Sequence, residues 1–163
     1  MGNNTVETVD KTRASIYLIK VLCMGLISAI LLTGCNGHGS ASLEEYFTNN
    51  PSAKDSMVQE INGQFESTGA KSKVEIEDND IIVTIDITDL AKEQGIEKTN
   101  KNEKVMKEEF DKAFSDKETS FCNSLTGLAD KVHSCSVTMK IKIVWDGDTI
   151  FSDSFKGEAT EKK

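Results

Sequence analysis

Residues 73–87 read KVEIEDNDIIVTIDI. Apolar side chains alternate with polar ones on both sides of Asp78-Asn79, a pattern typical of two β-strands joined by a tight turn. If these two residues form the loop, Ile76 pairs with Ile81, and the alternating apolar residues of both strands lie on one face. We therefore predict a hairpin with one buried face and one face open to water.

A second hairpin is predicted for residues 134–155. Apolar residues again alternate with Thr and Lys from Val137 to Trp145, and Asp146-Gly147 supplies the turn. We expect the face that carries the Lys side chains to be exposed.

Helical patterns precede both hairpins. Ser42-Leu43-Glu44-Glu45 has the form of a capping box, so a helix should begin there, restart at Pro51 and keep an apolar stripe to about Glu66. Apolar residues at helical spacing from Met106 to Val132 predict one long helix of roughly 25 to 30 residues, which could bend near Gly127. A shorter helical turn is predicted over residues 89–94.

The order of helix, hairpin, helix and hairpin makes two αββ units, each with an apolar sheet face to bury. Two helices packed on one face of a four-stranded antiparallel sheet would cover both. We therefore expect an α+β fold in which residues 42–156 form a single αββαββ domain and residues 157–163 form a disordered tail.

The N-terminal residues resemble an export signal. Residues 1–20 carry basic side chains, and the apolar run from Val21 to Leu32 is too short to span a bilayer as a helix. The next residues matter most: Leu32, Thr33, Gly34 and Cys35 resemble the lipobox of bacterial lipoproteins, in which the Cys is lipidated and becomes N-terminal after cleavage.

The lipobox resemblance implies three segments. Residues 1–34 would be a signal peptide, Cys35 would carry the lipid that anchors the protein in the membrane, and residues 35–41 would form the lipidated end and a flexible tether. An ordinary secretory signal that happens to end in Cys is the alternative.

The sequences SLEEY at residues 42–46 and WDGDTIF at residues 145–151 stand near the two ends of the predicted domain. With them, the region from Ser42 to Phe155 resembles a domain of unknown function found in small lipid-anchored proteins of Gram-positive bacteria. The resemblance implies the αββαββ architecture and a surface location, and it supplies no activity, substrate or site residue.

The two cysteines that would remain free after export and lipidation are Cys122 and Cys135. Outside the membrane such a pair suggests a disulfide. An unbroken helix from Cys122 to Val132 would rise about 15 Å and put Cys135 out of reach, so the bond requires a bend near Gly127. Two buried thiols are the alternative.

Composition and missing motifs limit the function. The 163 residues have a net charge of −8 and a single Arg, which argues against a nucleic-acid partner, and a hydrophobic share of 37% excludes a polytopic membrane protein. His38 and His133 have no partner at metal-ligand spacing, and we find no catalytic motif or cofactor-binding loop, so we predict no metal and no cofactor.

We therefore expect a lipid-anchored protein on the extracytoplasmic face of the cell membrane. Its domain should be non-catalytic and bind an extracellular protein or a cell-wall ligand, and its oligomeric state is left open. The alternative is a cell-envelope enzyme that uses acidic residues without a recognisable motif.

Overall fold

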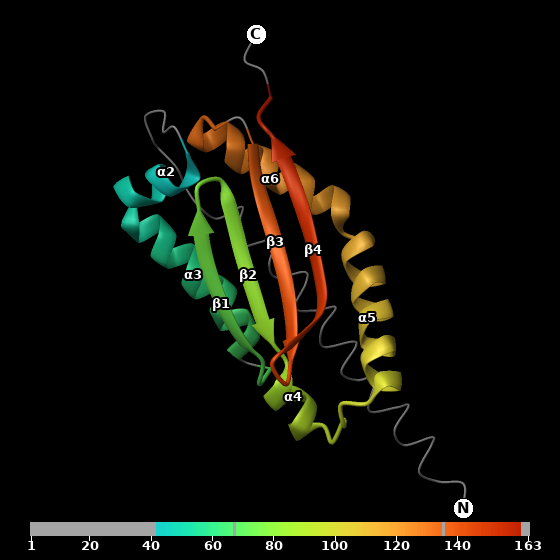
Figure 1. Ribbon diagram of the computed structural model, residues 1–163. Coiled ribbons are helices and arrows are strands. Elements are labelled where there is room, and N and C mark those ends of the chain that lie inside the picture. Colours follow the sequence, from blue (N-terminus) through green and yellow to red (C-terminus); the bar gives the residue numbers. More distant parts are fainter. Residues whose placement is uncertain (1–41, 67, 135, 161–163) are drawn as a thin grey trace, which may run out of the picture.

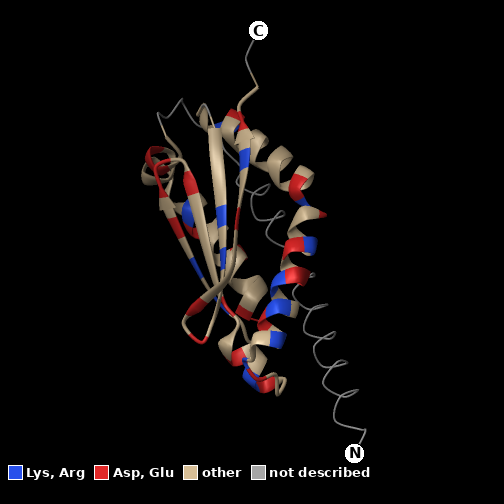
Figure 2. Cartoon of the chain, turned by 45° about the vertical axis from the view of Figure 1, so that its right-hand side comes forward, with Lys and Arg blue, Asp and Glu red and all other residues tan. Residues whose placement is uncertain are grey.

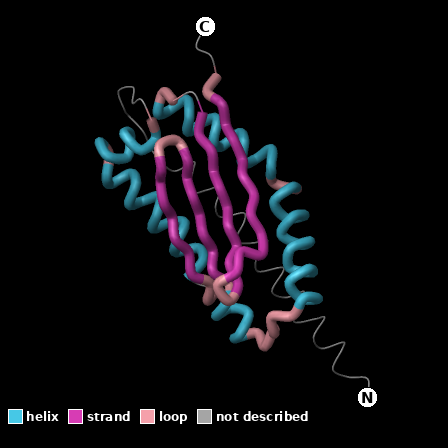
Figure 3. Tube along the Cα trace, viewed as in Figure 1, coloured by secondary structure: helices cyan, strands magenta, loops and turns pink. Residues whose placement is uncertain are grey.

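The computed structural model describes residues 42–66, 68–134 and 136–160, in which helices lie behind a four-stranded sheet (Figure 1). Figure 3 shows the same view, with the near face of the sheet uncovered by the helices. The elements are α2 (Leu43–Asn49), α3 (Pro51–Glu66), β1 (Lys71–Glu77), β2 (Asp80–Asp86), α4 (Thr88–Glu93), α5 (Asn100–Ser115), α6 (Glu118–Val132), β3 (Ser136–Trp145) and β4 (Asp148–Glu158).

The first hairpin is confirmed, including its register. Ile76 pairs with Ile81 and Glu77 pairs with Asp80, so Asp78-Asn79 is the loop. Asp78 has a φ of 52°, a left-handed conformation that Asp tolerates better than most residues.

The second hairpin is also confirmed, and it is longer than predicted. Its turn has positive φ angles at Asp146 and Gly147, as a two-residue hairpin loop favours. The strand β4 continues to Glu158, and beyond it the backbone N–H and the hydroxyl of Thr160 donate to the carboxylate of Asp130 at 2.7 and 2.8 Å. The predicted disordered tail is therefore wrong for residues 157–160, while residues 161–163 lie outside the described part.

The predicted antiparallel sheet is only partly right, because the central pair β2 and β3 is parallel. The sheet order is β1-β2-β3-β4, and each hairpin forms one antiparallel half. The chain between β2 and β3 runs through α4, α5 and α6, and such a long helical crossover returns the chain to the end of the sheet where β2 began. The strand β3 therefore runs in the same direction as β2.

The predicted long helix is two helices, and the break lies at residues 116–117 rather than at Gly127. The backbone N–H of Asp116 still donates to Lys112 O, whereas that of Lys117 donates to Phe114 O, which closes the helix with a tighter turn. The described residues therefore hold five helices and not two main ones, because α2 and α3 are separate, α4 is a helix of its own, and α5 and α6 replace the long helix.

An aromatic cluster joins α5 and α6 to β4. The ring of Phe121 stacks on that of Phe155 at 4.6 Å between centroids, and the ring of Phe114 stacks on that of Phe151 at 5.2 Å. These four side chains are at most 3% exposed. The break between α5 and α6 thus lets both helices direct Phe side chains at the same strand.

The apolar stripe predicted for α3 is confirmed, since Met57, Ile61 and Phe65 are buried.

Gly157 of β4 lies against α6. A Cβ atom added at Gly157 would overlap backbone atoms of Leu125 and Thr126, so this glycine sets how closely α6 approaches the sheet.

Candidate functional site

The face of the sheet turned away from the helices, which we call the open face, is a regular surface that no described element covers (Figure 3). Strand alternation places polar side chains on it, because the apolar partner of each pair points at the helices. The open face consists of Lys71, Lys73, Glu75 and Glu77 of β1, Asp80, Ile82, Thr84 and Asp86 of β2, Ser136, Thr138, Lys140, Lys142 and Val144 of β3, and Thr149, Ser152, Ser154, Lys156 and Glu158 of β4.

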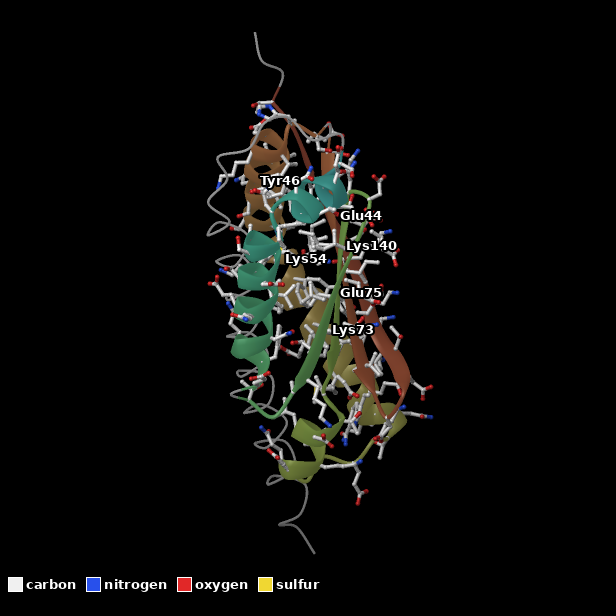
Figure 4. All side chains as sticks on the ribbon, turned by 90° about the vertical axis from the view of Figure 1, so that its left-hand side faces the viewer. Glu44, Tyr46, Lys54, Lys73, Glu75 and Lys140 are labelled. Carbon is white, nitrogen blue, oxygen red and sulfur yellow. The ribbon has the colours of Figure 1, made fainter. Side chains whose placement is uncertain are left out.

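Ion pairs hold several of these side chains in place. Lys73 Nζ lies 2.7 Å from a carboxylate oxygen of Glu75, and Lys140 pairs with Asp80 of the neighbouring strand. A hydrogen bond from Lys140 to Asp80 raises the pKa of the Lys140 ammonium group. Figure 4 shows Lys73, Glu75 and Lys140 on the side of the sheet away from α3.

Lys142 differs from the other lysines of the open face. It is exposed and makes no ion pair with any residue that the structure describes. Lys142 lies on β3, and its register partners are Thr84 of β2 on one side and Ser152 of β4 on the other. Two hydroxyl-bearing residues therefore flank its ammonium group. An ammonium group with adjacent hydroxyls suits a carboxylate or another anionic group.

Charge is distributed unevenly between the layers. Figure 2 marks residues of both charges on the strands and along α5, whereas much of α6 is uncharged. The pKa shifts follow from these surface contacts: a hydrogen bond from Lys71 lowers the pKa of Asp89, and one from Lys156 lowers that of Glu158. Each of these shifts favours the charged form, so the groups remain charged at neutral pH.

Asn79 connects the start of the described chain to the sheet. Its side-chain oxygen accepts hydrogen bonds from Leu43 N at 2.9 Å and from Ser134 Oγ at 3.0 Å, while Asp78 N donates to the Glu44 carboxylate at 3.0 Å. Sequence reasoning identified Asn79 only as a turn residue, because nothing local in the sequence indicates its distant partners.

The start of α2 forms as its capping box predicts. Ser42 Oγ accepts a hydrogen bond from Glu45 N at 3.1 Å. The first turn of α2 is thus fixed both by its own cap and by the β1–β2 loop, directly after the segment predicted to be the tether.

The predicted disulfide is not shown. Cys122 lies on α6 as a half-buried free thiol, and Cys135 lies outside the described residues. The helix α6 continues through Gly127 to Val132 without a break. The other predicted cysteine site, Cys35, lies outside the described residues with the rest of the lipobox, Leu32, Thr33 and Gly34.

The histidines provide no metal centre in the part of the chain that the structure describes. His133 follows α6 in a left-handed conformation with a φ of 55°, and His38 lies outside the described residues. Across residues 42–66, 68–134 and 136–160, no group of three or more His, Cys, Asp or Glu side chains is arranged to hold a metal ion.

None of the described helices has the length and apolar character needed to cross a membrane. No curated protein and no solved structure matches the chain. One family model does match: that of a domain of unknown function, DUF4854, which covers residues 43–155 and so extends from the first residue of α2 to Phe155 in β4. The chain therefore belongs to the DUF4854 family.

Proposed function

We propose that this protein is a lipoprotein anchored through Cys35 on the extracytoplasmic face of a Gram-positive cell membrane, and that its domain is a non-catalytic binding module. The lipobox at residues 32–35 supports the anchoring, and the open face supports the binding role. A sheet backed by packed helices holds the strands that carry its charged and hydroxyl residues in fixed positions, which lowers the entropic cost of binding.

Lys142 is the centre of the proposed binding surface. Its charge is not neutralised by a described residue, and Thr84 and Ser152 stand beside it in the sheet. The partner is accordingly an extracellular protein or a cell-wall component that presents an acidic group to the open face. The acidic net charge of the chain, −8, restricts such binding to local recognition and disfavours general adhesion to anionic polymers.

The binding role can be tested by photo-crosslinking on intact cells. A photo-reactive residue in place of Thr84 should give a specific crosslinked species that disappears when Lys142→Glu is added. The matched control places the same residue at Lys101, which is exposed on α5. Equal crosslinking from the two positions, or a species indifferent to Lys142→Glu, would contradict the proposal.

The anchoring has its own test, metabolic labelling with a palmitate analogue. Cys35→Ala should abolish labelling, whereas Cys23→Ala, which changes a cysteine inside the proposed signal peptide, should leave it unchanged. Labelling that survives Cys35→Ala would refute the anchor and leave the binding role untouched.

A further inference from the structure

The strand β1 forms one edge of the sheet, and no described strand pairs with its outer side. Figure 4 looks onto this edge, with α3 on one side of it and the open face on the other. Val74 and Ile76 of β1 pack against the core but remain half-buried, while Ile81 and Val83, their partners in β2, are fully buried. The edge therefore leaves apolar surface and backbone hydrogen-bonding groups available.

The hairpin register determines which backbone groups point outward. In a two-residue hairpin the residues that flank the loop, here Glu77 and Asp80, form a hydrogen-bonded pair. Alternation along β1 then directs the N–H and C=O groups of Ser72, Val74 and Ile76 away from β2. A second strand could pair with these three residues.

The charged residues of β1 would complement those of a second β1 strand that runs in the opposite direction. Counting outward from Val74, the open face carries Lys73 and Lys71 in one direction and Glu75 and Glu77 in the other. An antiparallel second copy of β1 centred on Val74 would place each Lys opposite a Glu, as cross-strand pairing favours.

Neighbouring registers lack this match. If the second strand is shifted by two residues in one direction, Lys73 lies opposite Lys73 of the second copy. A shift of two residues in the other direction places Glu75 opposite Glu75 of the second copy. A shift of one residue would set outward backbone groups against inward ones. Of these registers, only the one centred on Val74 satisfies charges and hydrogen bonds together.

We propose that β1 pairs with β1 of a second copy of this chain in an antiparallel manner, about a twofold axis through Val74, so that the two sheets become one. Such an interface is isologous, the commonest arrangement of homodimers. The pairing would also cover the half-buried Val74 and Ile76. It does not depend on the lipid anchor or on the partner of the open face.

The opposite edge, β4, lacks these features. Asp153 pairs with the buried Ile141 and therefore belongs to the helix side of the sheet, yet it is exposed at the edge. A charged residue directed inward on an edge strand discourages further strand pairing, as does the register shift between Ile143 and Val144. The two edges thus differ in their capacity to extend the sheet.

Disulfide trapping of the full chain, in cells that produce it, tests the proposal. Across the proposed axis the two Val74 Cα atoms would be about 5.5 Å apart, which suits a disulfide, so Val74→Cys should give a covalent dimer under mild oxidation. Ser72→Cys is the matched control, since its two copies would lie more than about 12 Å apart. The unsubstituted chain reports any bonding by the native cysteines.

Charge reversal in the Val74→Cys chain supplies the second test. Lys73→Glu alone should lower the dimer yield, with the association constant reduced by roughly tenfold, because two attractive pairs become repulsive. Adding Glu75→Lys to the same chain should restore it. Dimer yields that equal those of Ser72→Cys, that ignore both reversals, or that are replaced by a crosslink to a different protein would overturn the proposal.

Discussion

The two faces of the sheet are built from the same strands but differ in their exposure to water. On the covered face Val83 and Ile141 are fully buried, while one residue further along the same strands, Thr84 and Lys142 reach water on the open face. The buried side chains that stabilise the fold are therefore concentrated on the covered face, and the binding surface that we propose lies on the open face. Alternation lets each set of residues change with little effect on the other, and the following substitutions test that separation.

The largest loss of stability is expected from the covered face at Phe121. Phe121→Ala removes a ring that is fully buried between those of Phe114 and Phe155, and we expect a decrease of about 3–5 kcal/mol in the free energy of unfolding. Chemical denaturation measures it. Asn123→Ala, two residues along on the exposed side of α6, should change stability by less than about 0.5 kcal/mol. Similar losses in both variants would contradict the described packing.

The next largest loss of stability is expected at Gly157, where α6 lies close to β4. Gly157→Ala adds a methyl group that would lie 2.6 Å from Leu125 Cβ and overlap the helix backbone, so α6 must move outward at a cost of about 3 kcal/mol. Gly63→Ala is the control, because a methyl group there meets no atom within 4 Å and improves helix propensity. Thermal unfolding of the two variants should therefore shift in opposite directions, and a stable Gly157→Ala chain would refute the contact.

Asn79 connects α2, on the covered side, to the turn of the first hairpin. Asn79→Ala leaves Leu43 N and Ser134 Oγ without their shared acceptor, and we expect a loss of about 1–3 kcal/mol. Asn79→Asp retains an acceptor oxygen and should lose much less. Hydrogen exchange at the Leu43 amide provides a local measurement, and unchanged protection in Asn79→Ala would show that the bond is not formed.

A smaller, pH-dependent effect is expected where Lys98 meets Asp148 at the start of β4. A hydrogen bond from Lys98 lowers the pKa of Asp148, so the stabilisation is present above the ordinary carboxyl pKa and is lost as the pH falls through the lowered value. The same bond raises the pKa of Lys98, so the stabilisation is also lost as the pH rises above about 10.5.

Thermal unfolding between pH 2 and pH 6 tests the acidic limb. The Asp148→Asn chain should show a flatter dependence of its melting temperature on pH than the unsubstituted chain. Identical profiles would mean that Lys98 and Asp148 do not interact in solution.

The smallest effect on stability belongs to the open face. Lys142→Glu should alter the free energy of unfolding by less than about 0.5 kcal/mol, because the side chain is exposed and has no ion pair with a described residue. Circular dichroism during denaturation checks this expectation. A large destabilisation would remove the distinction between the two faces.

The hairpins could be predicted in detail because their information is local. The two-residue period around Asp78-Asn79 determines which residues pair, and the structure agrees at Ile76 and Ile81. The direction in which β3 joins β2 has no such local signal, because it depends on how three intervening helices pack. The parallel pair was therefore missed.

The position of the helix break shows the same limit. Gly127 is the residue that propensity marks as a weak point, yet α6 continues through it, whereas Asp116 and Lys117 stand at the break. The break follows from tertiary contacts of Phe114 and Phe121 with β4, and packing overrides propensity there. For the candidate site, the exposed Lys face could be predicted. The surroundings of Lys142, which has no ion pair among the described residues, depend on neighbours that only the sheet register reveals.

The parallel pair also determines how the molecule must fold in time. Each hairpin closes between neighbouring residues, but Ile81 and Met139, which lie side by side in the centre of the sheet, are about 60 residues apart in the chain. Joining the two halves must wait until the chain between them has been gathered into helices, so we expect this step to limit the folding rate. Until then the inner edge of β2 is unprotected, and a newly synthesised chain would be most prone to aggregation during this interval.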